Sequence, residues 1–222
     1  MKDSELVMPD HVVEFLNQFE MHRTAAGLRK KYQLRAANAV EGVYPILNEL
    51  KATTADTYLD IGCGTGAPSA FIAIMLKAKH IHLIDGKSED KVPKEHKAVD
   101  RRAGWNDGNF PWNSVEMAKT LVQANVDKDV TVHAHFANCP IDEFEKNSMD
   151  FISSFRSWGH HYPVDIYGAL VKHCLKPTGM VMLDIRNKTK GIDAMKAAGF
   201  AQVMRVPNHS EKCERWIFKH KE

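Results

Sequence analysis

The stretch Tyr58-Leu-Asp-Ile-Gly-Cys-Gly-Thr-Gly-Ala-Pro68 sets the pattern for the whole chain. It begins as a short apolar strand, passes through three glycines at positions 62, 64 and 66, and opens an apolar helix. Glycine has no Cβ atom, so this backbone can adopt unusual φ values and lets a ligand approach closely. Pro68 suits the start of a helix, where its missing N–H is not needed. This order of strand, glycine turn and helix predicts a site for a nucleotide-like ligand.

Asp60 separates two kinds of glycine turn. The spacing of Gly62, Gly64 and Ala67 also satisfies the dinucleotide-binding pattern Gly-x-Gly-x-x-Ala. A carboxylate two residues before the first glycine would repel a pyrophosphate and attract a cation. Asp60 to Gly66 resembles motif I, Asp-x-Gly-x-Gly-x-Gly, of the class I S-adenosylmethionine (SAM) methyltransferases, in which the loop wraps the amino-acid end of SAM. The resemblance implies cofactor contacts from Asp60, Gly62, Cys63, Gly64 and Gly66.

Composition fits one soluble α/β domain. The chain has 222 residues, 44% of them hydrophobic, and a formal net charge of +2, which is too balanced to indicate nucleic-acid binding. Residues 1–9 carry no apolar signal-peptide core, and no apolar run reaches the roughly 20 residues that span a membrane. The four cysteines form no Cys-x-x-Cys pair. We therefore expect a cytoplasmic protein with reduced thiols and without a nucleic-acid or membrane partner.

The N-terminal segment reads as helical. Asp10 is placed to cap a helix whose apolar face runs from Val12 to Phe19. Gly27 interrupts, and a second helix is expected from about Lys31 to Leu50, kinked or divided at Pro45.

The predicted division of the chain follows from these helices. Residues 1–54 are expected to form an N-terminal helical cap, and residues 55–222 the SAM-binding domain. The resemblance implies that such helices pack over the cofactor end of the sheet, which would bring Tyr32 and Arg35 within reach of the site.

The second strand of the core ends in an acid. Residues 80–84 alternate as a strand does, and Asp85 follows 19 residues after Gly66. That spacing is close to the roughly 20 residues expected for the acid that accepts the ribose hydroxyls. We predict cofactor contacts from Asp85 and Gly86. Residues 86–112 then form a long inserted loop, whose Trp105 and Trp112 are predicted to cover the substrate.

The third strand, residues 130–136, ends at Ala137-Asn138. In the methyltransferase family an Asp or Asn at this point hydrogen-bonds the adenine amino group, so the resemblance implies cofactor contacts from Ala137 and Asn138. His133 and His135 share one face of this strand and are possible metal ligands. No third ligand is apparent, so packed or surface histidines are favoured and no metal site is predicted.

The fourth strand, residues 149–154, resembles methyltransferase motif IV and ends at Ser154, a predicted cofactor contact. The segment that follows should ring the reacting group, because ligands bind beyond the carboxyl ends of such strands. His160 and His161 are the predicted bases for a hydroxyl. Arg156, Trp158 and Tyr162 are predicted to bind substrate. The stretch Ser157-Trp-Gly-His-His-Tyr-Pro163 is similar to a Ser-Trp-Gly-x-His-Tyr-Pro run of sugar O-methyltransferases.

The last strands complete the predicted fold. Residues 180–185 form a fifth strand, with Asp184 and Arg186 near the presumed substrate. Residues 201–206 and 215–219 resemble the reversed final hairpin of the methyltransferase fold. The predicted fold class is α/β, a Rossmann-like seven-stranded sheet, mostly parallel with a reversed last strand and with helices on both faces.

The predicted function is SAM-dependent methyl transfer to a hydroxyl of a small molecule, with a sugar as the favoured acceptor. Two alternatives remain: a methyltransferase for RNA or another polymer, and an NAD-binding Rossmann domain. A divalent metal held by Asp150, Asp184 or a histidine is possible but not indicated.

Overall fold

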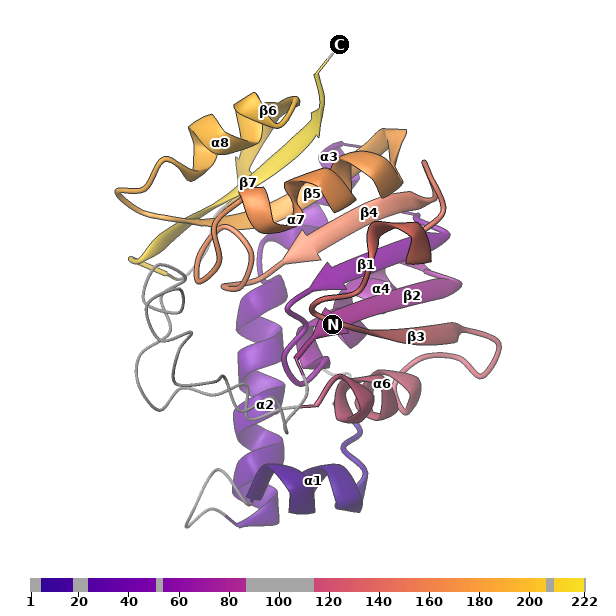
Figure 1. Ribbon diagram of the computed structural model, residues 1–222. Coiled ribbons are helices and arrows are strands. Elements are labelled where there is room, and N and C mark those ends of the chain that lie inside the picture. The colour runs from indigo at the N-terminus through magenta and orange to yellow at the C-terminus, as the bar shows by residue number, and fades with distance from the viewer. Residues whose placement is uncertain (1–4, 18–23, 51–53, 87–113, 207–209, 222) are drawn as a thin grey trace, which may run out of the picture.

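A computed structural model describes residues 5–17, 24–50, 54–86, 114–206 and 210–221 (Figure 1). Residues 87–112 of the predicted inserted loop, with Trp105 and Trp112, lie outside the described residues, and so do Phe19 and residues 51–53.

A seven-stranded sheet forms the centre of the molecule, in the order β3-β2-β1-β4-β5-β7-β6. The first five strands run parallel, and β7 pairs antiparallel with both β5 and β6. This confirms the predicted fold class. The strands are β1 (Thr57–Ile61), β2 (His80–Asp85), β3 (Thr131–Phe136), β4 (Met149–Ser154), β5 (Leu175–Arg186), β6 (Phe200–Val206) and β7 (Cys213–His220).

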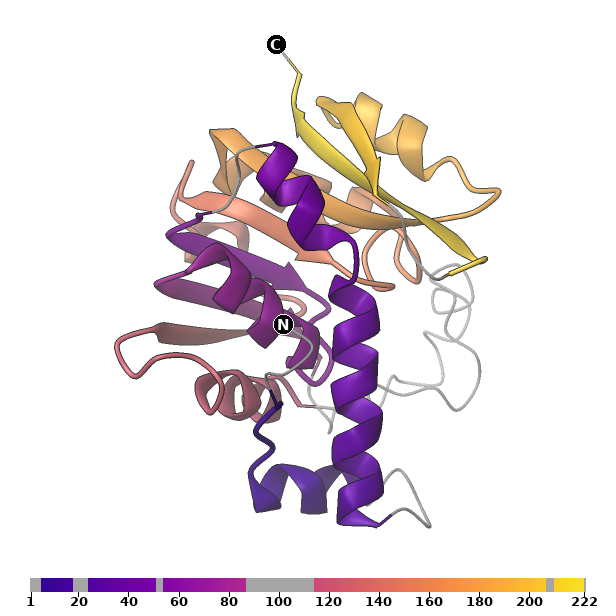
Figure 2. The ribbon, with the colours of Figure 1, turned by 180° about the vertical axis from the view of Figure 1, so that it is seen from behind.

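Helices cover both faces of the sheet. On one face, seen in Figure 2, α3 (Val43–Glu49), α4 (Ala67–Leu76) and α6 (Val115–Gln123) pack over the strands in one apolar cluster. On the other face, α7 (Asp165–Cys174) and α8 (Gly191–Ala197) close a second cluster. A short 3-10 turn, η2 (Ile141–Glu143), joins β3 to β4. Because both faces are covered, successive residues of the central strands are buried, as at residues 58–61 of β1 and 151–154 of β4.

Two further helices, α1 (Asp10–Asn17) and α2 (Ala25–Val40), share a third apolar cluster with residues of α4 and α6. The long helix α2 stands beside the carboxyl ends of β1 and β4 (Figure 1). The chain order of the strands reverses between β1 and β4, and such a switch point is where parallel sheets bind ligands. The fold therefore places α2 at the predicted site.

The N-terminal helices differ from the prediction at their breaks. Gly27 lies in the first turn of α2, where its N–H donates to Thr24 Oγ1 at 3.1 Å. The expected helix 31–50 is divided at Gly42, whose φ of 75° is left-handed, and not at Pro45. Proline is tolerated in the first turn of a helix, so Pro45 fits α3 without a kink.

The fifth strand begins earlier than the predicted residues 180–185. Residues 176–179 lie within β5, where its register with β4 shifts between the pairs Met149–Leu175 and Phe151–Met180.

All four cysteines carry free thiols. Within the described part of the chain, no helix combines the length and the apolar character needed to cross a bilayer.

Candidate functional site

The glycine turn after β1 is hydrogen-bonded to β2. The N–H groups of Gly62 and Cys63 both donate to the carbonyl oxygen of Ile84, at 2.7 and 3.2 Å. Gly62 has a φ of 71°, and a Cβ atom there would lie 1.9 Å from Ser157 Oγ. Gly66 has a φ of 77°, and its Cβ would meet the carbonyl oxygen of Ala118 at 2.8 Å. Both glycines are therefore required by packing as well as by conformation.

Gly64 differs from its neighbours in the space around it. Its φ is 60°, yet a Cβ atom placed on it would have no atom of the described residues within 4 Å. Its N–H donates to Asp85 Oδ2 at 2.6 Å, and Gly86 N–H donates to Asp85 Oδ1 at 2.7 Å. The acid at the end of β2 thus fixes the glycine turn.

Asp60 is 1% exposed and is held by hydroxyl groups. Ser69 donates to one carboxylate oxygen at 2.6 Å, and Ser153 donates to the other at 2.9 Å. Burial raises the pKa of Asp60 to about 6, and the nearby charge of Asp85 acts in the same direction. Such a carboxylate gains from a cation placed beside it.

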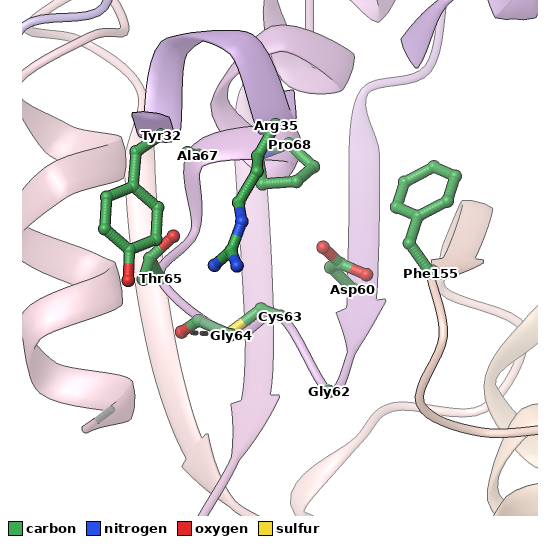
Figure 3. A pocket seen from close by; sticks show the side chains of 10 residues that line it. All are labelled: Tyr32, Arg35, Asp60, Gly62, Cys63, Gly64, Thr65, Ala67, Pro68 and Phe155. Carbon is green, nitrogen blue, oxygen red and sulfur yellow. Dashed lines mark hydrogen bonds between the residues drawn. The ribbon is translucent and has the colours of Figure 1, made fainter. Parts of the chain in front are cut away.

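A cavity of about 210 Å³ opens between this turn and α2. Figure 3 shows Arg35 reaching from α2 into the space between the glycine turn and Asp60, with Tyr32 beside Thr65. Burial raises the pKa of the Cys63 thiol well above its usual range, so at this wall Cys63 is an apolar group. The lining residues are Tyr32, Arg35, Asp60, Gly62, Cys63, Gly64, Thr65, Ala67, Pro68 and Phe155.

A second, larger cavity of about 640 Å³ adjoins the first. The two share Arg35, Pro68 and Phe155, so a group bound in one would lie next to a group bound in the other. The second cavity is lined by charged, polar and apolar residues from α2, α4, the turn after β4, β5, the segment before β7 and β7 itself: Arg35, Asn38, Ala39, Pro68, Phe155, Arg156, His161, Asp184, Ser210 and Arg215.

A buried ion pair forms one wall of the second cavity. Arg215 on β7 donates through Nε and Nη2 to the two oxygens of Asp184 on β5, at 2.8 and 3.2 Å. The same guanidinium donates to the carbonyl oxygen of Ala39 and lies 4.3 Å from the ring centroid of Phe155. Asp184 therefore lines the second cavity with its charge already paired, and its predicted contact with substrate stays a prediction.

The turn after β4 is built around one carbonyl group. The oxygen of Ser157 accepts the N–H groups of residues 160, 161 and 162, at 3.1, 2.7 and 3.1 Å. Ser154 Oγ donates to the carbonyl oxygen of Ile61 and accepts from Trp158 N–H, and its side chain is fully buried. Ser154 thus ties this turn to β1 and offers no surface to a cofactor, which corrects its predicted role.

Trp158 is also corrected. Its ring is 0% exposed within the apolar cluster under α7, and its Nε1–H donates to the carbonyl oxygen of Val164 at 2.8 Å. A ring without exposed surface holds the turn in place and does not contact a substrate.

The two adjacent histidines are placed differently. His161 is exposed and lines the second cavity. Both ring nitrogens of His160 are buried and have no partner among the described residues, and burial, followed by the charges of His161 and Arg186, lowers the pKa of His160 to about 4. The rings meet edge to face, with centroids 4.6 Å apart. Of the two predicted bases, only His161 faces the cavity.

The other predicted residues lie at the same edge of the sheet but outside the two cavities. Ala137 N–H donates to the carbonyl oxygen of Asp85, and the Ala137 carbonyl accepts from Tyr167 OH, so the exposed turn at Ala137 and Asn138 sits beside the end of β2. Arg186 is exposed at the end of β5, and Tyr162 is half-buried in the turn after β4. Their predicted contacts with cofactor and substrate stay predictions.

The histidines of β2 and β3 form a packed row. His82 Nδ1 lies 3.0 Å from His135 Nε2, and the ring of His82 stacks on that of His133 with centroids 4.5 Å apart. No group of three or more His, Cys, Asp or Glu side chains in the described ranges is arranged to hold a metal ion. Asp150 lies near the start of β4, at the opposite end of the strands from the site. It binds Lys176 at 2.7 Å and Thr57 N–H at 3.0 Å, so it is not a metal ligand at the site.

Comparison with protein-family models and with curated proteins finds no match. Among solved structures, a candidate type 11 methyltransferase from Sulfolobus solfataricus is 17% identical, with a TM-score of 0.50 over 80% of this chain and 90% of that chain. A protein from Pyrococcus horikoshii OT3 is 14% identical, with a TM-score of 0.51 over 85% and 92%. The tRNA methyltransferase TrmK of B. subtilis is 12% identical, with a TM-score of 0.50 over 81% and 65%. These likenesses show the fold, that of the class I methyltransferases.

Sequence reasoning missed several residues of the site. Asn38, Phe155, Ser210 and Arg215 line the second cavity but belong to no local motif. Arg215 is an arginine within a strand of apolar character, and a buried position for such a residue is the only signal that could have drawn attention to it.

Proposed function

We propose that this chain is a SAM-dependent methyltransferase that acts on a hydroxyl group of a small molecule. The observation that carries the proposal is the hydrogen bond from Gly64 N–H to Asp85, which joins the glycine turn after β1 to the acid at the end of the neighbouring strand β2, in a methyltransferase-type sheet. Two of the solved structures that share this fold are methyltransferases, which supports this choice.

The residues of the first cavity fit the cofactor. Gly64 leaves room for close approach of a ligand, Asp60 favours an ammonium group, and the guanidinium of Arg35 suits a carboxylate. The ammonium and the carboxylate are the charged groups of the amino-acid end of SAM. We further propose that Asp85 accepts hydrogen bonds from the ribose hydroxyls, and that Asn138 accepts one from the adenine amino group. When bound, SAM supplies a methyl group activated by its sulfonium.

The second cavity is proposed to hold the acceptor. It adjoins the first through Phe155 and Pro68, and its volume of about 640 Å³ suits a small molecule. His161 is the proposed base and takes the proton of the acceptor hydroxyl. His160 has no exposed nitrogen, so we assign it to packing behind His161. The similarity of residues 157–163 to the sugar O-methyltransferase run supports a sugar as acceptor.

Calorimetric titration of the full-length protein with SAM, S-adenosylhomocysteine and NAD tests the proposal. Binding of SAM and S-adenosylhomocysteine with no heat from NAD is expected, and the reverse preference would establish the dinucleotide alternative. Transfer of labelled methyl groups to a panel of sugars and to RNA then tests the acceptor. Methyl transfer to RNA with none to the sugars would contradict a small-molecule acceptor. In that case, the salt dependence of RNA binding would report the number of phosphate contacts.

A further inference from the structure

The charges around the second cavity do not balance. Among the described residues that line it, Arg35, Arg156 and Arg215 are cationic, and Asp184 is the single acid. The positive charge that the cavity presents to a ligand depends on which of these arginines is already paired.

Arg215 does not contribute to the net positive charge of the second cavity. Its guanidinium is 4% exposed, it donates to both oxygens of Asp184, and a further N–H donates to the carbonyl oxygen of Ala39. This pair is closed and neutral, and it serves as a rigid wall.

Arg35 belongs to the first cavity as well as to the second. Figure 3 shows its guanidinium directed into the space between the glycine turn and Asp60, where the proposed cofactor presents its carboxylate. With cofactor bound, the charge of Arg35 is offset there.

Arg156 is left facing the second cavity. Its side chain is exposed and makes no hydrogen bond or ion pair with any residue that the structure describes. Its φ of 59° is left-handed, a conformation that is costly for a residue with a Cβ atom. The turn holds it there through the three N–H groups bound to Ser157 and the buried ring of Trp158. Strained residues held by a well-determined turn are frequent at ligand sites.

We propose that the acceptor carries an anionic group, a carboxylate or a phosphate, and that Arg156 binds this group at the mouth of the second cavity. The inference rests on the proposed function, because it assigns a class of acceptor to the cavity beside the cofactor. The planar guanidinium fork pairs with two oxygens of either anion, which fixes orientation as well as charge. The acceptor is therefore a hydroxylated acid or a phosphate ester, and a neutral sugar would leave Arg156 unsatisfied.

The test uses the full-length protein saturated with S-adenosylhomocysteine, with sodium phosphate and sodium acetate as separate probes in calorimetric titrations. Wild type should bind at least one of the two anions at a single saturable site, and the anion that binds identifies the group as a phosphate or a carboxylate. Arg156→Gln should weaken that binding at least tenfold, and Arg156→Lys should be intermediate because it keeps the charge and loses the fork. Lys77→Gln, at the opposite edge of the sheet, is the control and should bind as wild type does.

The Arg156→Gly variant distinguishes loss of the guanidinium group from misfolding as the cause of weaker anion binding. Glycine accepts the left-handed φ, so this variant should melt no lower than wild type and still lose anion binding. Saturable binding that survives in Arg156→Gly, or no saturable binding of either anion to wild type, would overturn the inference. If S-adenosylhomocysteine binds while both anions fail, only this inference falls. If S-adenosylhomocysteine itself does not bind, the proposed function falls, and this inference with it.

Discussion

Arg215 and Asp184 form a two-point ion pair across the antiparallel strands β7 and β5, with N–O distances of 2.8 and 3.2 Å and exposures of 4% and 1%. The pair joins the last strand of the chain to the wall of the proposed acceptor cavity. Its contact with the carbonyl oxygen of Ala39 also ties α2 to the sheet, so one buried charge pair connects three elements that shape the site.

Breaking this pair on one side should be strongly destabilising. Arg215→Met leaves the Asp184 carboxylate buried without a cation, which costs about 3–5 kcal/mol of unfolding free energy. The double variant Asp184→Leu/Arg215→Met removes both charges and should regain most of that loss. Urea unfolding of the two variants measures the difference, and a double variant as unstable as the single one would show that packing, not charge, explains the effect.

Gly62 and Gly64 should respond differently to alanine. At Gly62 the new Cβ would lie 1.9 Å from Ser157 Oγ in a left-handed backbone, so Gly62→Ala should lose about 3 kcal/mol from overpacking and strain together. Gly64→Ala carries the backbone strain alone, about 1 kcal/mol. Ser157→Gly added to Gly62→Ala should restore part of the loss in thermal or urea unfolding. Equal destabilisation by both alanines would contradict the contact with Ser157.

The free energy of unfolding should fall at mildly acidic pH because His160 is protonated more readily in the unfolded chain than in the folded chain. Its pKa is lowered to about 4 in the folded chain, chiefly by burial, while an unfolded histidine has a pKa of about 6.5. The unfolded state therefore binds the proton first, and stability is lost as the pH falls from about 6.5 towards 4. Because the ring is only half-buried, we expect His160→Gln to lessen the loss between pH 7 and pH 5 by about 1 kcal/mol.

Urea unfolding at the two pH values measures this difference. His80→Gln, at an exposed histidine, is the control and should leave the loss unchanged. An identical pH dependence in wild type and His160→Gln would show that His160 is not buried as described.

Local features of the sequence predicted most of the fold. The glycine turn, the alternation of strands with helices and the 19-residue spacing from Gly66 to Asp85 are properties of continuous segments of the chain, so the sequence alone displays them. The break at Gly42 was missed because a glycine and a proline lie close together there, and propensity alone does not tell which one ends the helix. The role of Trp158 was wrong because its burial depends on strand β5 and helix α7, which are remote in sequence.

The composition of the site was only partly predictable for the same reason. Arg35 and Phe155 meet the glycine turn only in the folded chain, and Arg215 reaches Ala39 across 176 positions of sequence. No periodicity or short motif encodes such contacts. The histidine pair was predictable as a pair, but which member faces the cavity depends on the turn that Ser157 closes.

Substitution of His161 should lower turnover much more than substitution of His160. On a hydroxyl compound that wild type methylates, His161→Ala is expected to lower turnover about 10²–10⁴-fold while SAM affinity stays within a few-fold. His160→Gln should reduce turnover only slightly. Steady-state kinetics, with calorimetry for the cofactor, separates the two effects. Comparable turnover in wild type and His161→Ala would remove His161 as the base.

The central claim is that the glycine turn and Asp85 bind SAM, and titration of S-adenosylhomocysteine into wild type and Asp85→Ala tests it most directly. Hydrogen bonds from ribose hydroxyls to a carboxylate are each worth about 1–3 kcal/mol, so Asp85→Ala should bind at least tenfold more weakly. Asp56→Ala removes an acid at the opposite edge of the sheet, paired with Lys79 at 3.0 Å, and should bind as wild type does. A folded Asp85→Ala protein with unchanged affinity, or a wild type that does not bind, would contradict the account.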